Sequence, residues 1–212
     1  MKRMLVAVTM AAFGLTACGE PAAEPASQQE ASASSSSASA DHGSFRGLAL
    51  ETPLARPSFT LTDDAGAPFD FLASTEGKPT LLFFGYTNCP DICPTTMADV
   101  AVAIRELPAE LASTVQVVFV TTDPANDTGP VLAEFLDHFD SDLPNGFVGL
   151  TGSLEQVEAA QRAARVTVAM DMGQTHSAQL QLYGTDDLAR VVYVGGSSPD
   201  DIVHDLPLVA QG

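Results

Sequence analysis

The order of apolar and polar positions predicts strands that alternate with helices from about residue 45 onward. Segments 58–62 and 68–72 alternate apolar with polar residues around a turn signal, which predicts an N-terminal β-hairpin. Continuous apolar runs predict buried strands, and apolar residues three and four positions apart predict amphipathic helices. The remaining predicted elements are strands at 80–86, 114–122, 147–150, 178–183 and 190–194, and helices at 95–106, 129–139, 153–165 and 199–206.

This order of elements predicts an α/β domain with a central mixed sheet and helices on both faces. The last strands form a second hairpin, and a helix follows them. The arrangement fits a thioredoxin-like fold with the first hairpin as an N-terminal extension. No internal repeat is visible in the sequence.

The first 18 residues have the pattern of an export signal. Lys2 and Arg3 precede an apolar run at 4–15, which is too short to cross a bilayer as a helix. The run ends in Leu-Thr-Ala-Cys, which resembles the lipobox of bacterial lipoproteins. That resemblance implies cleavage before Cys18 and attachment of a lipid to this cysteine. The alternative is an ordinary signal peptide that happens to contain a cysteine.

Ala, Ser, Glu, Gln and Pro dominate the next segment, which has no aromatic or large aliphatic residue between positions 20 and 41. Such a composition buries too little apolar surface to offset the entropy of ordering. We therefore predict a signal peptide at 1–17, a lipid-anchored flexible tether at 18–44 and one domain at 45–212. The domain is expected on the periplasmic side of a bacterial membrane.

The chain is strongly acidic, with 27 Asp and Glu against 9 Lys and Arg and a formal net charge of −18. Removal of Lys2 and Arg3 with the signal peptide leaves 27 acidic against 7 basic residues, or −20. Nucleic acids and anionic membrane surfaces are themselves negative, so this balance argues against both as the main partner. We expect membrane contact through the lipid anchor only.

Cysteine use in the predicted domain is confined to Cys89 and Cys93. A disulfide between them closes a very short loop and adds little stability, so the pair predicts chemistry rather than a structural staple. The positive end of the helix predicted to follow them favours a thiolate. Pro94 is tolerated in the first turn of that helix but biases Cys93 away from helical geometry. The pair suits a redox dithiol, a soft-metal site such as Cu(I), or both.

Two further residues are candidates for the same site. His176 precedes the predicted second hairpin, where thioredoxins carry a proline beside the redox cysteines, and suits a third metal ligand. Asp123 directly follows the C-terminal end of the predicted strand 114–122, where α/β proteins place functional groups, and is a candidate to support a ligand by hydrogen bonding. The alternatives are a loop histidine bonded to backbone and an aspartate that only opens a turn before proline.

The residues around these candidates resemble the Sco/SenC family of copper-binding proteins. The resemblance rests on Phe-Gly-Tyr-Thr-Asn-Cys-Pro-Asp-Ile-Cys-Pro at 84–94, on Val-Thr-Thr-Asp-Pro-Ala-Asn-Asp-Thr at 120–128 and on His176-Ser177. It implies a thioredoxin fold, copper ligation by Cys89, Cys93 and His176, and a role in assembling the dinuclear copper centre of cytochrome c oxidase. One departure is Thr175, because this family commonly has an aspartate before the histidine.

Two functions follow from these features. The first is a membrane-anchored copper chaperone that carries Cu(I) or Cu(II) and works with the oxidase subunit holding the dinuclear copper centre, or with another copper chaperone. The second is a thiol–disulfide oxidoreductase that uses Cys89 and Cys93 on the cysteines of a partner. The two activities are compatible, because thiols must be reduced before they bind copper.

Overall fold

The structure, a computed structural model, describes residues 45–168 and 178–211. Eight strands are present in this part of the chain. They are β1 (Leu48–Ala55), β2 (Thr60–Asp63), β3 (Pro68–Asp70), β4 (Thr80–Gly85), β5 (Gln116–Thr121), β6 (Val148–Thr151), β7 (Gln179–Tyr183) and β8 (Leu188–Val194). They form one sheet in the order β1-β8-β7-β4-β5-β6-β2-β3. The predictions at Cys18 and His176 lie outside the described residues.

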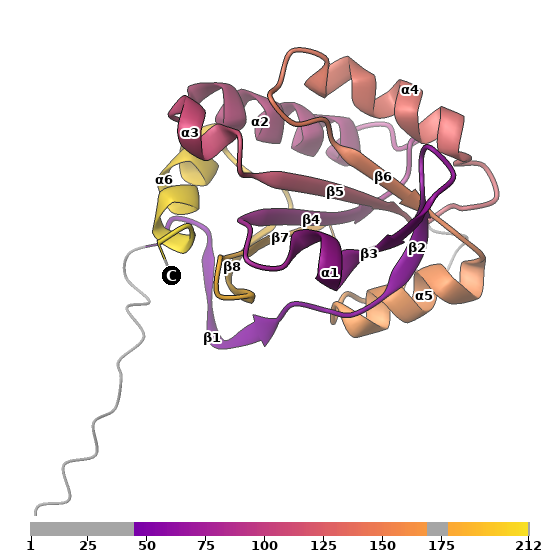
Figure 1. The fold of residues 1–212 in the computed structure, drawn as a ribbon, viewed down its shortest axis with the longest axis horizontal. Helices are drawn as coiled ribbons and strands as arrows, with labels where there is room; N and C mark the ends of the chain where they lie inside the picture. The colour runs from indigo at the N-terminus through magenta and orange to yellow at the C-terminus, as the bar shows by residue number, and fades with distance from the viewer. Residues whose placement is uncertain (1–44, 169–177, 212) are drawn as a thin grey trace, which may run out of the picture. The chain divides into compact units, whose positions relative to one another are not determined.

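The sheet is mixed, as the sequence predicts (Figure 1). β4, β5 and β6 are parallel neighbours, whereas the other strands pair antiparallel. The carboxyl ends of β4, β5 and β6 therefore meet at one edge, together with the start of β7 and the end of β8. Loops at this edge carry the cysteine pair.

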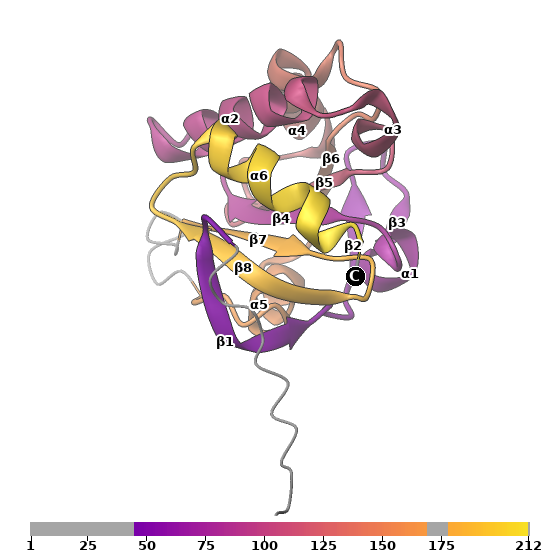
Figure 2. The same cartoon turned by 90° about the vertical axis from the view of Figure 1, so that its left-hand side faces the viewer.

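Helices cover both faces of the sheet (Figure 2). They are α1 (Phe71–Thr75), α2 (Ile92–Glu106), α3 (Ala109–Ala112), α4 (Gly129–Asp140), α5 (Leu154–Ala163) and α6 (Pro199–Val209). α2, α4 and α6 pack on one face, where Phe83 and Phe119 of the sheet meet Met97. Phe84 and Val120 point to the other face, against α5.

The predicted hairpin of residues 58–72 is confirmed by the antiparallel pairing of β2 with β3. Its second strand is shorter than predicted, because Asp70 caps α1 by accepting a hydrogen bond from the Ala73 N–H and residues 71–72 are helical. β1 and α3 were not predicted. β1 contains Pro53 and a register irregularity between Ala49 and Leu54, features that an edge strand tolerates but that hide its pattern.

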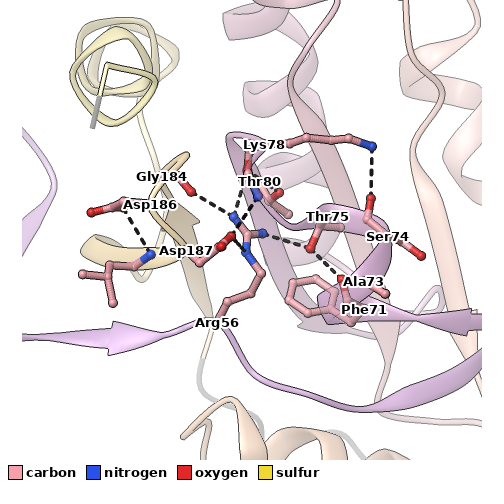
Figure 3. Close-up of polar contacts among 12 residues, drawn as sticks. Arg56, Phe71, Ala73, Ser74, Thr75, Lys78, Thr80, Gly184, Asp186 and Asp187 are labelled. Carbon is pink, nitrogen blue, oxygen red and sulfur yellow. Dashed lines mark hydrogen bonds and ion pairs between the residues drawn. The ribbon is translucent and has the colours of Figure 1, made fainter.

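A buried arginine holds together the edge of the sheet opposite the cysteines (Figure 3). The Arg56 side chain has no exposed surface, and its guanidinium pairs with Asp187 at 2.7 Å. It also donates to the Thr75 hydroxyl at 2.9 Å and to the carbonyls of Lys78 and Gly184 at 2.8 and 2.9 Å. These bonds join the chain after β1 to α1, to the start of β4 and to the β7–β8 turn.

Candidate metal and thiol site

The two thiols lie where β4 passes into α2. Cys89 lies in the loop after β4, and Cys93 is the second residue of α2. Both are reduced; Cys89 is 8% exposed, and Cys93 is fully buried. The Cys93 N–H donates to Cys89 Sγ at 3.4 Å, so the start of the helix folds around the first sulfur.

The predicted geometry of Cys93 is wrong in one respect. Although it precedes Pro94, Cys93 is helical, and α2 begins at Ile92 rather than at residue 95. Pro94 fits the first turn because the N–H that it lacks has no partner within the helix at this position. The earlier start places backbone N–H groups close to Cys89.

Gly85 allows the close approach of β4 to the second thiol. A Cβ at this position would lie 2.9 Å from Cys93 Sγ and 2.7 Å from the Phe83 ring. No real side chain tolerates such contacts without displacing one of these buried neighbours. The glycine before the cysteine loop is therefore a packing requirement of Cys93.

The two thiols have opposite protonation tendencies. Burial raises the pKa of Cys89, but hydrogen bonds from the Cys93 thiol and from the N–H groups of Asp91, Cys93 and Ile92 outweigh burial and lower that pKa below its ordinary value. Burial raises the pKa of Cys93 strongly, and its bond to Cys89 adds to the rise. The prediction that the helix start favours a thiolate is thus confirmed for Cys89 and wrong for Cys93.

Asp127 is the buried carboxylate of this site, and the sequence analysis did not single it out. It is 1% exposed and accepts hydrogen bonds from the Thr87 N–H at 3.0 Å and from the hydroxyls of Thr87 and Thr121 at 2.6 Å. It thereby ties the cysteine loop to the end of β5, and its charge contributes to the raised pKa of Cys93. The available signal was a second aspartate four residues after Asp123.

Asp123 has a different setting. It follows β5 as predicted, but it is half-buried, and its carboxylate accepts a hydrogen bond from the Asn126 side chain at 2.8 Å. Its carbonyl accepts from the N–H groups of Asn126 and Asp127, so it opens a turn. Its support of a metal ligand stays a prediction.

Of the predicted metal ligands, the structure brings together Cys89 and Cys93. Within residues 45–168 and 178–211 no group of three or more His, Cys, Asp or Glu side chains is placed to hold a metal ion. The third predicted ligand, His176, falls in segment 169–177, outside the described residues. The dithiol thus offers two sulfur donors side by side.

Comparison with known proteins identifies the family. A sequence model described as SCO1/SenC matches residues 49–211. The chain belongs to the SCO1/SenC family. Its relatives include the "Putative copper-binding protein" of Stutzerimonas stutzeri, 36% identical over 149 residues, an alignment that covers 68% of this chain and 71% of the relative. The mitochondrial SCO2 homologue of Mus musculus is 33% identical over 164 residues, which cover 74% of this chain and 62% of that protein.

Solved structures of the same family resemble this one. ScoI of Bradyrhizobium japonicum with copper bound is 30% identical with a TM-score of 0.60, over 74% of this chain and 99% of that one. A SCO1/SenC family lipoprotein from Bacillus anthracis is 27% identical with a TM-score of 0.63, over 76% and 99% of the two chains. BsSco, a Sco family cytochrome c oxidase assembly protein with a disulfide switch, is 26% identical with a TM-score of 0.61, over 75% and 95%.

These likenesses confirm the predicted thioredoxin-like fold and the family resemblance at the cysteine motif. The finer predictions concern the anchor and the ligands. No helix among the described residues is long and apolar enough to cross a membrane.

Proposed function

We propose that this protein is a copper chaperone that binds one copper ion through Cys89, Cys93 and His176. In this role it delivers copper to the dinuclear copper centre of cytochrome c oxidase, or prepares the thiols of that centre. The observation that carries the proposal is the reduced thiol pair at the start of α2, where hydrogen bonds lower the pKa of Cys89. Relatives solved with copper bound support it.

The donor set favours a soft ion. Thiolates suit Cu(I), and an imidazole accepts either Cu(I) or Cu(II). Because Cys93 is buried with a raised pKa, binding through both sulfurs requires the metal to displace the Cys93 proton. Copper affinity should therefore rise with pH.

Copper titration of the reduced, purified protein tests the ligand set. We expect one copper per chain, loss of this copper in Cys89→Ser and Cys93→Ser, and weaker binding in His176→Ala. His138→Ala is the matched control, because His138 is exposed on α4 and contacts the carbonyl of Glu134. Unchanged stoichiometry and affinity in His176→Ala would remove this histidine from the ligand set.

We further propose that a lipid on Cys18 holds the domain at the periplasmic side of a bacterial membrane, with residues 18–44 as the tether. A family member solved from Bacillus anthracis is a lipoprotein, which supports this arrangement. Cys18→Ser should release the protein from membranes, and mass spectrometry should show the lipid on the unaltered chain. A membrane-bound Cys18→Ser protein would contradict the anchor.

The asymmetry of the thiols favours a second function, thiol–disulfide exchange with a partner. The Cys89 thiolate attacks a partner disulfide, forms a mixed disulfide and releases one partner sulfur, which takes a proton. Cys93 then gives up its proton and attacks Cys89 Sγ, which releases the second partner thiol. Two electrons pass from the dithiol to the partner, and the chain ends as the Cys89–Cys93 disulfide.

Alkylation rates as a function of pH test this order of attack. Cys93→Ala removes the thiol that donates to Cys89, so the pKa of Cys89 should rise and its alkylation at neutral pH should slow. Cys89→Ser should leave Cys93 nearly unreactive, because Cys93 is buried. Equal reactivity of the two single-cysteine proteins would contradict the assignment of Cys89 as the attacking thiol.

A further inference from the structure

A pocket of about 490 Å³ opens at the carboxyl ends of β5 and β6. One wall is the loop after β5, with Thr122, Asp123 and Pro124, and the other is the junction of β6 with α5, with Ser153 and Leu154. Its volume suits one or two side chains or a small ligand. Neither Cys89 nor Cys93 is among the residues that line it.

The pocket adjoins the dithiol through a short chain of contacts. Thr122 in its wall donates from its N–H and its hydroxyl to the carbonyl of Gly85, at 2.6 and 3.2 Å. Gly85 in turn packs against Cys93 Sγ, as its close approach shows. Asp127, one residue beyond the pocket wall, bonds the cysteine loop at Thr87. The pocket wall is therefore bonded to the end of β4, from which the loop that carries Cys89 starts.

The lining of the pocket is mainly apolar and includes one carboxylate, Asp123. Leu154 is 55% exposed at the start of α5, and it lines the pocket together with Pro124. The Asp123 carboxylate accepts one hydrogen bond from Asn126 and has no ion-pair partner among the described residues. Segments 86–91, 122–128 and 152–154 contain no lysine or arginine.

The start of α5 does not suit an anion. The N–H of Gln156 is already used, because Ser153 and Gln156 satisfy each other's backbone N–H groups in a capping box. Glu155 adds a negative charge in the first turn. A second copy of this chain is equally unsuited, because two chains of net charge −18 repel each other.

We propose that this pocket is the docking site for the protein that exchanges copper or a disulfide with Cys89. The partner inserts an apolar side chain against Leu154 and Pro124 and places a lysine or arginine beside Asp123. This inference rests on the proposed function and adds the surface that brings the partner's cysteines to the thiol. Attraction between the Asp123 carboxylate and a basic partner speeds the encounter of the two proteins and fixes their relative orientation.

Copper transfer to two acceptors tests the docking site. The copper(I)-loaded protein is mixed with the isolated copper-accepting domain of the oxidase subunit, and separately with a small Cu(I) chelator. Leu154→Ser should slow transfer to the domain about tenfold, as the loss of an apolar anchor does, and leave removal by the chelator unchanged. Asp123→Asn should also slow transfer to the domain, with an effect that shrinks as salt is raised.

The matched controls are Leu208→Ser on α6 and Glu110→Gln on α3, both exposed and distant in sequence from the pocket. Both should transfer copper at the rate of the unaltered protein. Equal transfer by all variants would overturn the docking site while leaving the proposed function intact. If Asp123→Asn instead slowed copper transfer to both the domain and the chelator, and Leu154→Ser slowed neither, Asp123 would act at the metal. That result would overturn the docking site. No transfer by the unaltered protein would overturn the proposed function and the docking site with it.

Discussion

Two buried charged side chains, Arg56 and Asp127, lie at opposite ends of β4, and they differ in the partners that stabilise their charges. At the start of the strand, the Arg56 guanidinium has a carboxylate partner, Asp187, besides its neutral hydrogen-bond acceptors. At its end, the Asp127 carboxylate is bonded only to an N–H and two hydroxyls, with no cation paired to it among the described residues. Its negative charge therefore acts on the neighbouring Cys93 thiol.

The difference separates a structural cluster from a functional one. A buried ion pair with all its hydrogen bonds made fixes the positions of the segments that it joins. A buried carboxylate without a cation is costly, and the charge of Asp127 raises the pKa of the neighbouring Cys93 thiol. Four substitutions, taken from the largest expected effect to the smallest, test this division.

Arg56→Met should have the largest effect on stability. It removes one of the hydrogen-bond donors to Asp187, to the Thr75 hydroxyl and to the carbonyls of Lys78 and Gly184, and breaking one partner of a buried pair costs about 3–5 kcal/mol. Chemical denaturation measures the loss, and thiol titration should be unchanged. The control is Arg105→Met, whose pair with Asp142 is exposed to solvent and contributes little to stability. An equally small loss in Arg56→Met would contradict the structural role.

Asp127→Asn should have a smaller effect on stability and a larger one on the thiols. Replacing a charged acceptor costs about 1.5–3 kcal/mol. The pKa of Cys93 should fall, because the carboxylate that disfavours its thiolate is gone. Thiolate absorbance against pH in a Cys89→Ser background measures this change.

The control for Asp127→Asn is Asp140→Asn, which removes another buried carboxylate, one that accepts from the Phe147 N–H at the start of β6. It should leave the pKa of Cys93 unchanged. If both variants gave the same thiol titration, the negative charge of Asp127 would have no special relation to the cysteine pair.

Two threonine substitutions sharpen the comparison further. Thr75→Val removes an acceptor of Arg56, and Thr121→Val removes a donor to Asp127. Each should cost about 1 kcal/mol, the net value of one hydrogen bond. Only Thr121→Val should move the thiol titration, with a further rise in the pKa of Cys93, because the carboxylate loses a stabilising donor. A changed pKa of Cys93 in Thr75→Val would show that the two ends of β4 are coupled.

Helices α2, α4, α5 and α6 and the inner strands followed from the apolar pattern alone. Ser153 and Gln156 form the capping box that the sequence predicts at the start of α5, since such a cap depends only on neighbouring residues. β1 escaped prediction because Pro53 and the irregular pairing with β8 interrupt its pattern. The helical geometry of Cys93 was also missed. A residue before proline is locally biased away from helical geometry, but α2 begins at Ile92 and includes Cys93.

The sequence by itself determined the family, the mixed sheet and the pair Cys89 and Cys93, because motif spacing and hydrophobic periodicity are written in neighbouring residues. Tertiary structure alone decided that Cys89 is slightly more accessible to solvent than Cys93, which thiol has the lowered pKa and which aspartate lies beneath the site. Burial and long-range hydrogen bonds set those properties, and they join residues as far apart as Thr87 and Asp127. No local pattern reports such contacts.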